Sequence, residues 1–137
     1  MKKYLFHILS SLLLIILSIM IGCKDTVVDS NIDQMIIPSS NVSYSQHIQP
    51  IFDAKCLNSG CHNDQNQAGG LSLTNWANTT SNPSIVFPEH PENSRLVWAI
   101  EGMGAPLMPP VTAPVTPLTE NHREGIKTWI REGAKNN

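Results

Sequence analysis

Three segments of the chain carry apolar residues at the three- to four-residue spacing of a helix with one buried face. The apolar positions are Tyr44, Ile48, Ile51 and Phe52 in the first segment, Leu96, Val97 and Ile100 in the second, and Ile126, Trp129 and Ile130 in the third. The first helix either begins near Gln49 or is kinked there, because Pro50 has no amide N–H to donate. Residues 91–94 open the second helix. Thr119 caps the third, which ends at Gly133.

The segments between these helices predict irregular structure. Residues 64–70 form a polar loop, and residues 71–90 contain too many Asn, Thr, Ser and Pro residues for a helix. We expect extended chain there, with a short hairpin between residues 71–73 and 85–87. Residues 101–119 contain five prolines and two glycines, which predict a stiff irregular loop.

The N-terminus has the pattern of an export signal. Lys2 and Lys3 precede residues 5–21, which are mostly apolar, and Gly22 precedes Cys23. This pattern predicts a lipoprotein signal peptide over residues 1–22, with Cys23 acylated as the first residue of the mature chain; the alternative is an uncleaved signal anchor. Either way the remaining chain is exported to the cell envelope, where it is periplasmic or surface-exposed.

Residues 23–42 are interpreted as a lipidated tether, and residues 43–137 as the domain. The tether shows no sustained apolar period, and Pro38 and its polar neighbours interrupt any regular pattern. As a free coil, residues 24–42 have a root-mean-square reach of roughly 25 Å. A short strand over residues 35–37 is the alternative.

Composition narrows the possible functions. The 137 residues are 41% hydrophobic and 15% charged, which suits one small domain with appendages. A net charge of −2 gives no electrostatic basis for a nucleic-acid partner. Three Phe, three Trp and two Tyr make a thin apolar core for this length, and a large buried apolar group would supply the missing apolar surface.

The segment with the clearest chemistry contains Cys56 and Cys61, with His62 directly after the second cysteine. A cysteine pair closed by Cys-His is the attachment signature of c-type haem, in which two thioethers hold the porphyrin and the imidazole binds the iron. The usual pattern has two residues between the cysteines, whereas this chain has four. Five helical steps place the second cysteine roughly 140° away from the first. The chain must therefore bulge between them, and Asn58 and Gly60 suit such a turn.

Two other uses of the cysteines are open from the residues alone. A local disulfide between Cys56 and Cys61 forms easily in an oxidising compartment. A structural zinc site is disfavoured because it needs four ligands and no second Cys/His pair is present. His62 and the segments downstream favour haem over the disulfide.

A sixth iron ligand is predicted in the proline-rich loop. Met108 precedes Pro109 and Pro110, which restrict the backbone beside it. A Met/His pair on haem iron raises the reduction potential. Met103 is the competing ligand, and gap-filling in the core is the alternative role for Met108.

Other polar or small residues receive structural interpretations. His47 is interpreted as a surface residue or one that contacts an iron ligand, with haem ligation as the alternative. His122 is expected in solvent in the first turn of the last helix. Arg95 is read as an exposed helix residue, with neutralisation of a haem propionate as the alternative. Gly125, in the middle of the last helix, indicates close approach by another backbone, for which the first helix is the natural partner.

Residues 43–135 resemble a small class I type cytochrome c domain, most of all the version described from planctomycetes. The matching residues are the I-x-P-I-F-x-x-x-C run ending at Cys56, Cys61-His62, G-G-L-x-L at 69–73, I-V-x-P-x-x-P-E-x-S at 85–94, M-P-P at 108–110, and L-T…I-x-x-W-I-x-x-G-A at the end. The resemblance implies an all-α fold of three to four helices, with long irregular loops, around one covalently attached haem c. It also implies His62 and Met108 as axial ligands.

The expected role is single-electron transfer between redox partner proteins, with membrane attachment through the lipid and no catalysis. Two alternatives are a disulfide-stapled binding or structural lipoprotein without haem, and an enzymatic or gas-sensing haem with an open sixth position.

Overall fold

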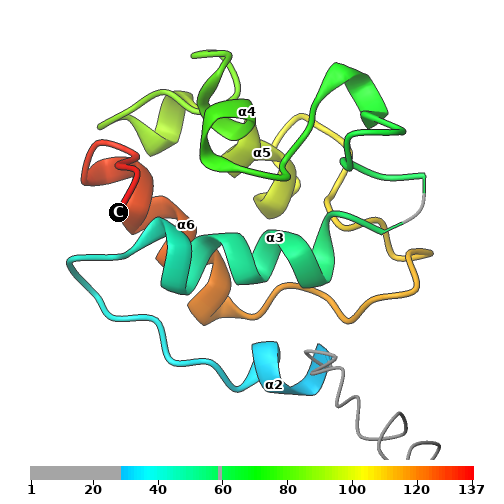
Figure 1. Cartoon of the computed structure of the whole chain (residues 1–137), viewed down its shortest axis with the longest axis horizontal. Coiled ribbons are helices and arrows are strands. Elements are labelled where there is room, and N and C mark those ends of the chain that lie inside the picture. The colour runs from blue at the N-terminus through cyan, green and yellow to red at the C-terminus, as the bar shows by residue number, and fades with distance from the viewer. Residues whose placement is uncertain (1–28, 59) are drawn as a thin grey trace, which may run out of the picture.

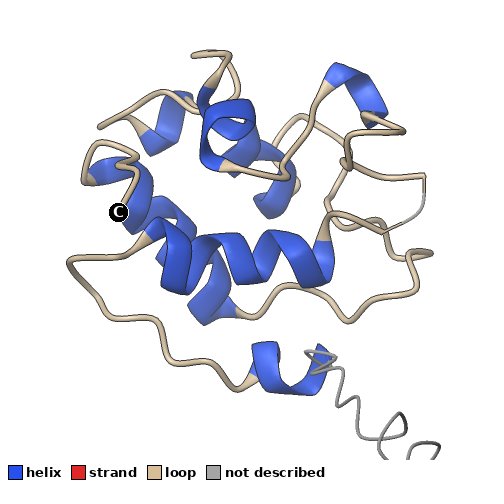
Figure 2. Ribbon diagram, in the orientation of Figure 1, coloured by secondary structure: helices blue, strands red, loops and turns tan. Residues whose placement is uncertain are grey.

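The computed structural model describes residues 29–58 and 60–137 of the chain (Figure 1). Within that part, the α-helices are α2 (Asp29–Asp33), α3 (Gln49–Lys55), α4 (Trp76–Thr80), α5 (Arg95–Glu101) and α6 (Glu120–Arg131). A π-helical turn over Tyr44–Ile48 leads into α3, and 3-10 turns occupy Ala68–Gly70 and Pro91–Asn93. The described residues contain no strand (Figure 2), which confirms the predicted all-α fold.

The three helices predicted from apolar spacing are all present. The first begins at Gln49, where a π-helical turn changes into α3, and Pro50 lies in its first turn. The second is α5, preceded by the turn over Pro91–Asn93. The third is α6, where the Thr119 side chain accepts a hydrogen bond from the His122 backbone N–H.

The interpretation of residues 71–90 as extended chain with a hairpin is wrong. Residues 71–73 and 85–87 form no strand pair, and α4 lies between them. The Asn75 side chain caps α4 by accepting a hydrogen bond from the Asn78 backbone N–H at 2.9 Å. A capped helix of only five residues forms here because tertiary contacts hold it: the Trp76 indole N–H donates to the Ala134 carbonyl at 2.8 Å.

The core gathers around α6. Trp129 and Ile130 are fully buried there, and the Trp129 ring lies 5.2 Å from the Tyr44 ring of the π-helical turn. The apolar faces of α3 and α5 complete the cluster, with Ile51 and Ile100 among the buried residues.

Residues 29–42, here called the strap, pack against the domain (cyan in Figure 1). Ile32, Ile37 and Val42 are buried in the core cluster. The Glu132 carboxylate accepts hydrogen bonds from the backbone N–H groups of residues 41 and 42 at 2.7 and 2.9 Å. The expectation of a free coil is therefore wrong for residues 29–42, and residues 35–37 form no strand.

The strap also explains the glycine in the middle of α6. A Cβ at Gly125 would lie 2.7 Å from two side-chain carbons of Ile37, closer than real contacts allow. The close approach predicted at Gly125 is thus made by the Ile37 side chain, and the expectation that the first helix supplies it is wrong.

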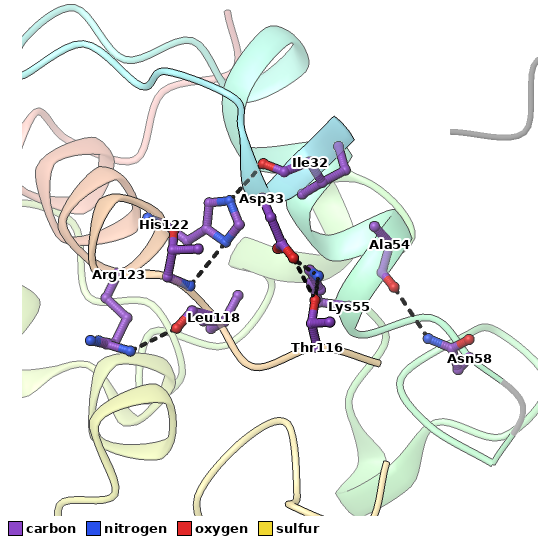
Figure 3. A network of polar contacts seen from close by, with 10 residues as sticks. Ile32, Asp33, Ala54, Lys55, Asn58, Thr116, Leu118, His122 and Arg123 are labelled. Carbon is purple, nitrogen blue, oxygen red and sulfur yellow. Dashed lines mark hydrogen bonds and ion pairs between the residues drawn. The ribbon is translucent and has the colours of Figure 1, made fainter. Parts of the chain in front are cut away.

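His122 is another correction, because its side chain is fully buried instead of lying in solvent. Its Nε2 lies 2.9 Å from the Ile32 carbonyl oxygen, and its Nδ1 lies 3.3 Å from the Thr119 backbone nitrogen (Figure 3). The imidazole therefore joins the strap to the beginning of α6.

No helix among the described residues is long and apolar enough to cross a membrane. The predicted signal peptide and the predicted lipidation residue Cys23 lie outside the described residues.

Candidate cofactor site

The two cysteines of the motif follow the end of α3. The Cys56 backbone N–H donates to the Phe52 carbonyl at 2.8 Å and so closes the helix. The chain then folds back, and the His62 backbone N–H donates to the Cys56 carbonyl at 3.0 Å. Gly60 lies within this bend at φ +82°, a conformation that favours glycine. The bend is the bulge that the four-residue spacing requires.

An apolar cavity lies between α3, α5 and α6. Its empty volume, counted with its open mouth, is about 900 Å³. Cys56 and His62 face it from the bend after α3, and Met108 faces it from the proline-rich loop. Its apolar lining includes Ile51, Phe52, Leu73, Leu96, Ile100 and Ile126.

A second cavity of about 530 Å³ continues beside the first and includes Cys61 in its lining. Cys56, His62 and Met108 line both cavities. The structure thus brings the four side chains named from the motif and the proline-rich loop to two adjoining apolar cavities that share lining residues.

The His62 ring is oriented by the chain that follows it. Its Nδ1 lies 3.4 Å from the Leu71 carbonyl oxygen. A carbonyl can only accept, so this contact favours the tautomer with its proton on Nδ1 and leaves Nε2 available to a metal. The Leu73 backbone N–H also donates to the His62 carbonyl at 2.9 Å. Every residue has a backbone carbonyl, so nothing in the sequence marks the one at Leu71 as the partner of His62. The sequence analysis therefore did not predict this contact.

The two candidate methionines occupy different environments. Met108 is partly buried and faces the cavity, and its backbone N–H donates to the Ala99 carbonyl of α5 at 2.9 Å. Met103 is 61% exposed and lines neither cavity. Burial and orientation both favour Met108 over Met103 as a ligand.

The Cys56 sulfur lies in a setting that keeps it neutral. Burial, with a further contribution from Cys61, raises the pKa of the Cys56 thiol to about 12. A protonated thiol is a poor metal ligand and a poor nucleophile. Cys56 and Cys61 are not joined to each other by a disulfide.

A polar recess adjoins the apolar cavity and shares Gly69, Leu71, Ile85 and Arg95 with it. Its other lining side chains carry amides and hydroxyls: Gln67, Ser72, Asn78, Ser81 and Asn82. Arg95 is exposed at this junction and makes no ion pair within the described part of the chain. A ligand with an apolar body and an anionic edge fits this pair of surfaces.

Comparison with known families bears on the same segment. Residues 56–111 match the family model described as planctomycete cytochrome C. The match supports a planctomycete-type cytochrome c domain in that part of the chain. This match covers both cysteines, His62 and Met108. The cytochrome c family implies a covalently bound haem, and the disulfide-stapled alternative is not favoured. The chain matched no curated protein and no solved structure.

The residues present fit a haem group. Two thiols can form thioethers, an imidazole and a thioether sulfur are known haem-iron ligands, and the space between them is apolar. The adjoining Arg95 and amide side chains suit propionate groups.

Proposed function

We propose that this protein is an exported, membrane-anchored monohaem c-type cytochrome that carries single electrons between redox partner proteins. The observation that carries the proposal is the convergence of a cysteine and a histidine from the bend after α3 with a methionine from the proline-rich loop on one apolar cavity. Cytochrome c family members are typically electron carriers and not enzymes, so we expect no catalysis.

Each side chain has a separate task in this proposal. Cys56 and Cys61 would hold the haem through thioether bonds, and His62 and Met108 would supply the two protein ligands of its iron. The contact from His62 Nδ1 to the Leu71 carbonyl orients the imidazole ring and leaves Nε2 available to the iron. With both axial positions filled, the protein needs no substrate site. When bound, the haem supplies an iron centre that changes by one electron between its ferrous and ferric states.

The environment of the cavity suits this task. Apolar side chains from α3, α5 and α6 exclude water from the cofactor, and low polarity together with a methionine ligand favours the ferrous state. In this proposal, acylation of Cys23 attaches the protein to the membrane. Several acyl chains make this attachment stable, whereas a single chain would not.

The test is to produce the full chain in cells that contain the haem-maturation machinery. We expect coloured protein with a Soret band, and a mass that includes one haem on the fragment containing Cys56 and Cys61. A Cys56→Ala/Cys61→Ala double variant should lose the covalent haem. Cys23→Ala is the matched control, because it removes a cysteine, should lose the lipid and should keep the haem. Colourless wild-type protein whose two motif sulfurs are bonded only to each other would overturn the proposal.

A further inference from the structure

Lys55, the last residue of α3, is a buried cation beside the cofactor site. The residue is 2% exposed, and its side chain lines the same cavity as Cys56, Cys61 and Met108. A buried ammonium group is stable only when a counter-charge and hydrogen-bond acceptors surround it. The partners of Lys55 therefore help to determine the structure of the cavity wall that Lys55 forms with Cys56, Cys61 and Met108.

Those partners come from two distant segments (Figure 3). The Lys55 Nζ lies 2.8 Å from an Asp33 carboxylate oxygen and also donates to the Thr116 hydroxyl. The Thr116 hydroxyl in turn donates to the other Asp33 oxygen at 2.7 Å. The three side chains, here called the clasp, form a closed triangle that joins the strap, α3 and the loop carrying Met108.

Thr116 is the anchor of its loop. Residues 109–117 include four prolines, which have no N–H to donate. Within the described part of the chain, the hydrogen bonds of Thr116 are the only ones that connect residues 109–117 to another element. On the other side of Met108, its own N–H binds the Ala99 carbonyl. Met108 is thus held between one attachment to α5 and one attachment to the clasp.

The position of Asp33 depends on the contacts of its strap neighbours with α6. The Ile32 carbonyl oxygen lies 2.9 Å from Nε2 of the buried His122, and the Asn121 side chain accepts from the Ile37 backbone N–H at 3.0 Å. These contacts attach both sides of Asp33 to α6, so the carboxylate has a fixed position from which to reach Lys55 and Thr116.

We propose that Asp33 and Thr116 are positioning residues for the sixth iron ligand. The clasp keeps the proline-rich loop closed over the cavity and so keeps the Met108 sulfur at the iron. This inference rests on the proposed function, in which Met108 is the axial ligand. It gives the N-terminal segment a role in the redox site, although the strap lines neither cavity.

The experiment measures how easily an external ligand replaces Met108 in the ferric holoprotein. Free imidazole is titrated, and loss of the near-infrared methionine-to-iron band reports replacement. Asp33→Asn keeps the shape but removes the counter-charge of Lys55, so the loop should open more often. Because apparent affinity scales with the open fraction, imidazole should bind Asp33→Asn about tenfold more tightly than wild type. Thr116→Val removes only the loop anchor and should give a gain of about threefold.

Three comparisons make the result specific. Asp33→Glu keeps the charge and should restore most of the wild-type affinity. Glu124→Gln is the matched control, because it also breaks a carboxylate–lysine pair, with Lys127 on α6, but lies outside both cavities. If the Asp33→Asn holoprotein cannot be produced, the imidazole affinity of Thr116→Val alone tests the proposal. If imidazole binds Asp33→Asn and Thr116→Val no more tightly than wild type, the clasp does not position Met108. That result would leave the proposed haem protein function standing. Absence of the methionine band in wild type would instead overturn Met108 ligation.

Discussion

At the scale of single residues, the two methionines of the proline-rich loop differ in what surrounds them. Met108 lies between a backbone hydrogen bond to α5 and two prolines, and it faces apolar space. Met103 lies between two glycines and is mostly exposed. A ligand bond to iron requires a sulfur that is held near one position, since a mobile side chain loses conformational entropy on binding.

We therefore predict opposite outcomes for two matched alanine variants. Met108→Ala should remove the methionine-to-iron band and lower the reduction potential by on the order of 0.1 V, because axial ligands are a main determinant of haem potentials. Met103→Ala should leave both unchanged. Spectra and redox titration of the two holoproteins check this. A reversed pattern would identify Met103 as the ligand, and an unchanged spectrum in both would favour an open sixth position.

The residues that carry covalent chemistry could be named from the sequence, whereas their supports could not. Cys56, Cys61 and His62 lie within one short stretch of the chain, so a local pattern contains them. Lys55 and His122 were not identified, because their partners Asp33 and Ile32 lie 22 and 90 residues away. A lysine in the last turn of a helix normally extends to solvent, and a histidine in a first turn is normally exposed. Both side chains are buried because the folded strap packs against them.

At the scale of elements, the strap is the segment whose contribution is easiest to isolate. Its neighbouring residues Ile36 and Ile37 have the same side chain but opposite environments, with 86% and 6% of the residue exposed. Ile37 fills the space that Gly125 leaves open on α6. The pair therefore separates docking of the strap from any general effect of removing an isoleucine.

We predict that Ile37→Ala lowers the free energy of unfolding by about 2–4 kcal/mol, the usual cost of truncating a buried isoleucine. Ile36→Ala should change it by less than about 0.5 kcal/mol. Urea unfolding of the two holoproteins, followed by circular dichroism, measures both. Equal losses in the two variants would mean that the strap does not dock as described.

Elements with their own local signals were predicted, and elements that depend on distant contacts were not. The helix α6 combines an apolar stripe with a capping threonine, and both signals are local. The short helix α4 depends on the bond from Trp76 to Ala134, which lies 58 residues away. The buried strap residues Ile32, Ile37 and Val42 are spaced five apart, a period that matches neither helix nor strand. Sequence periodicity therefore gave no reason to place that segment in the core.

At the scale of the whole molecule, the candidate cofactor site and the hydrophobic core share residues. Ile51, Leu96 and Ile126 line the apolar cavity and belong to three different helices, so a haem bound there would complete the contacts among α3, α5 and α6. The thin aromatic content of the chain is consistent with a porphyrin that supplies apolar surface. Loading of haem and consolidation of the fold should therefore occur together.

The docked strap also limits how far a lipid-anchored domain can extend from the membrane. Only residues 24–28 lie between Cys23 and α2, and at full extension they span about 20 Å. We predict by neutron reflectometry that the lipidated holoprotein on a supported bilayer begins within that distance of the headgroups. Inserting fifteen Gly/Ser residues after Lys24 should move it outward and broaden the layer. Identical profiles for the two proteins would mean that the strap is released at the membrane.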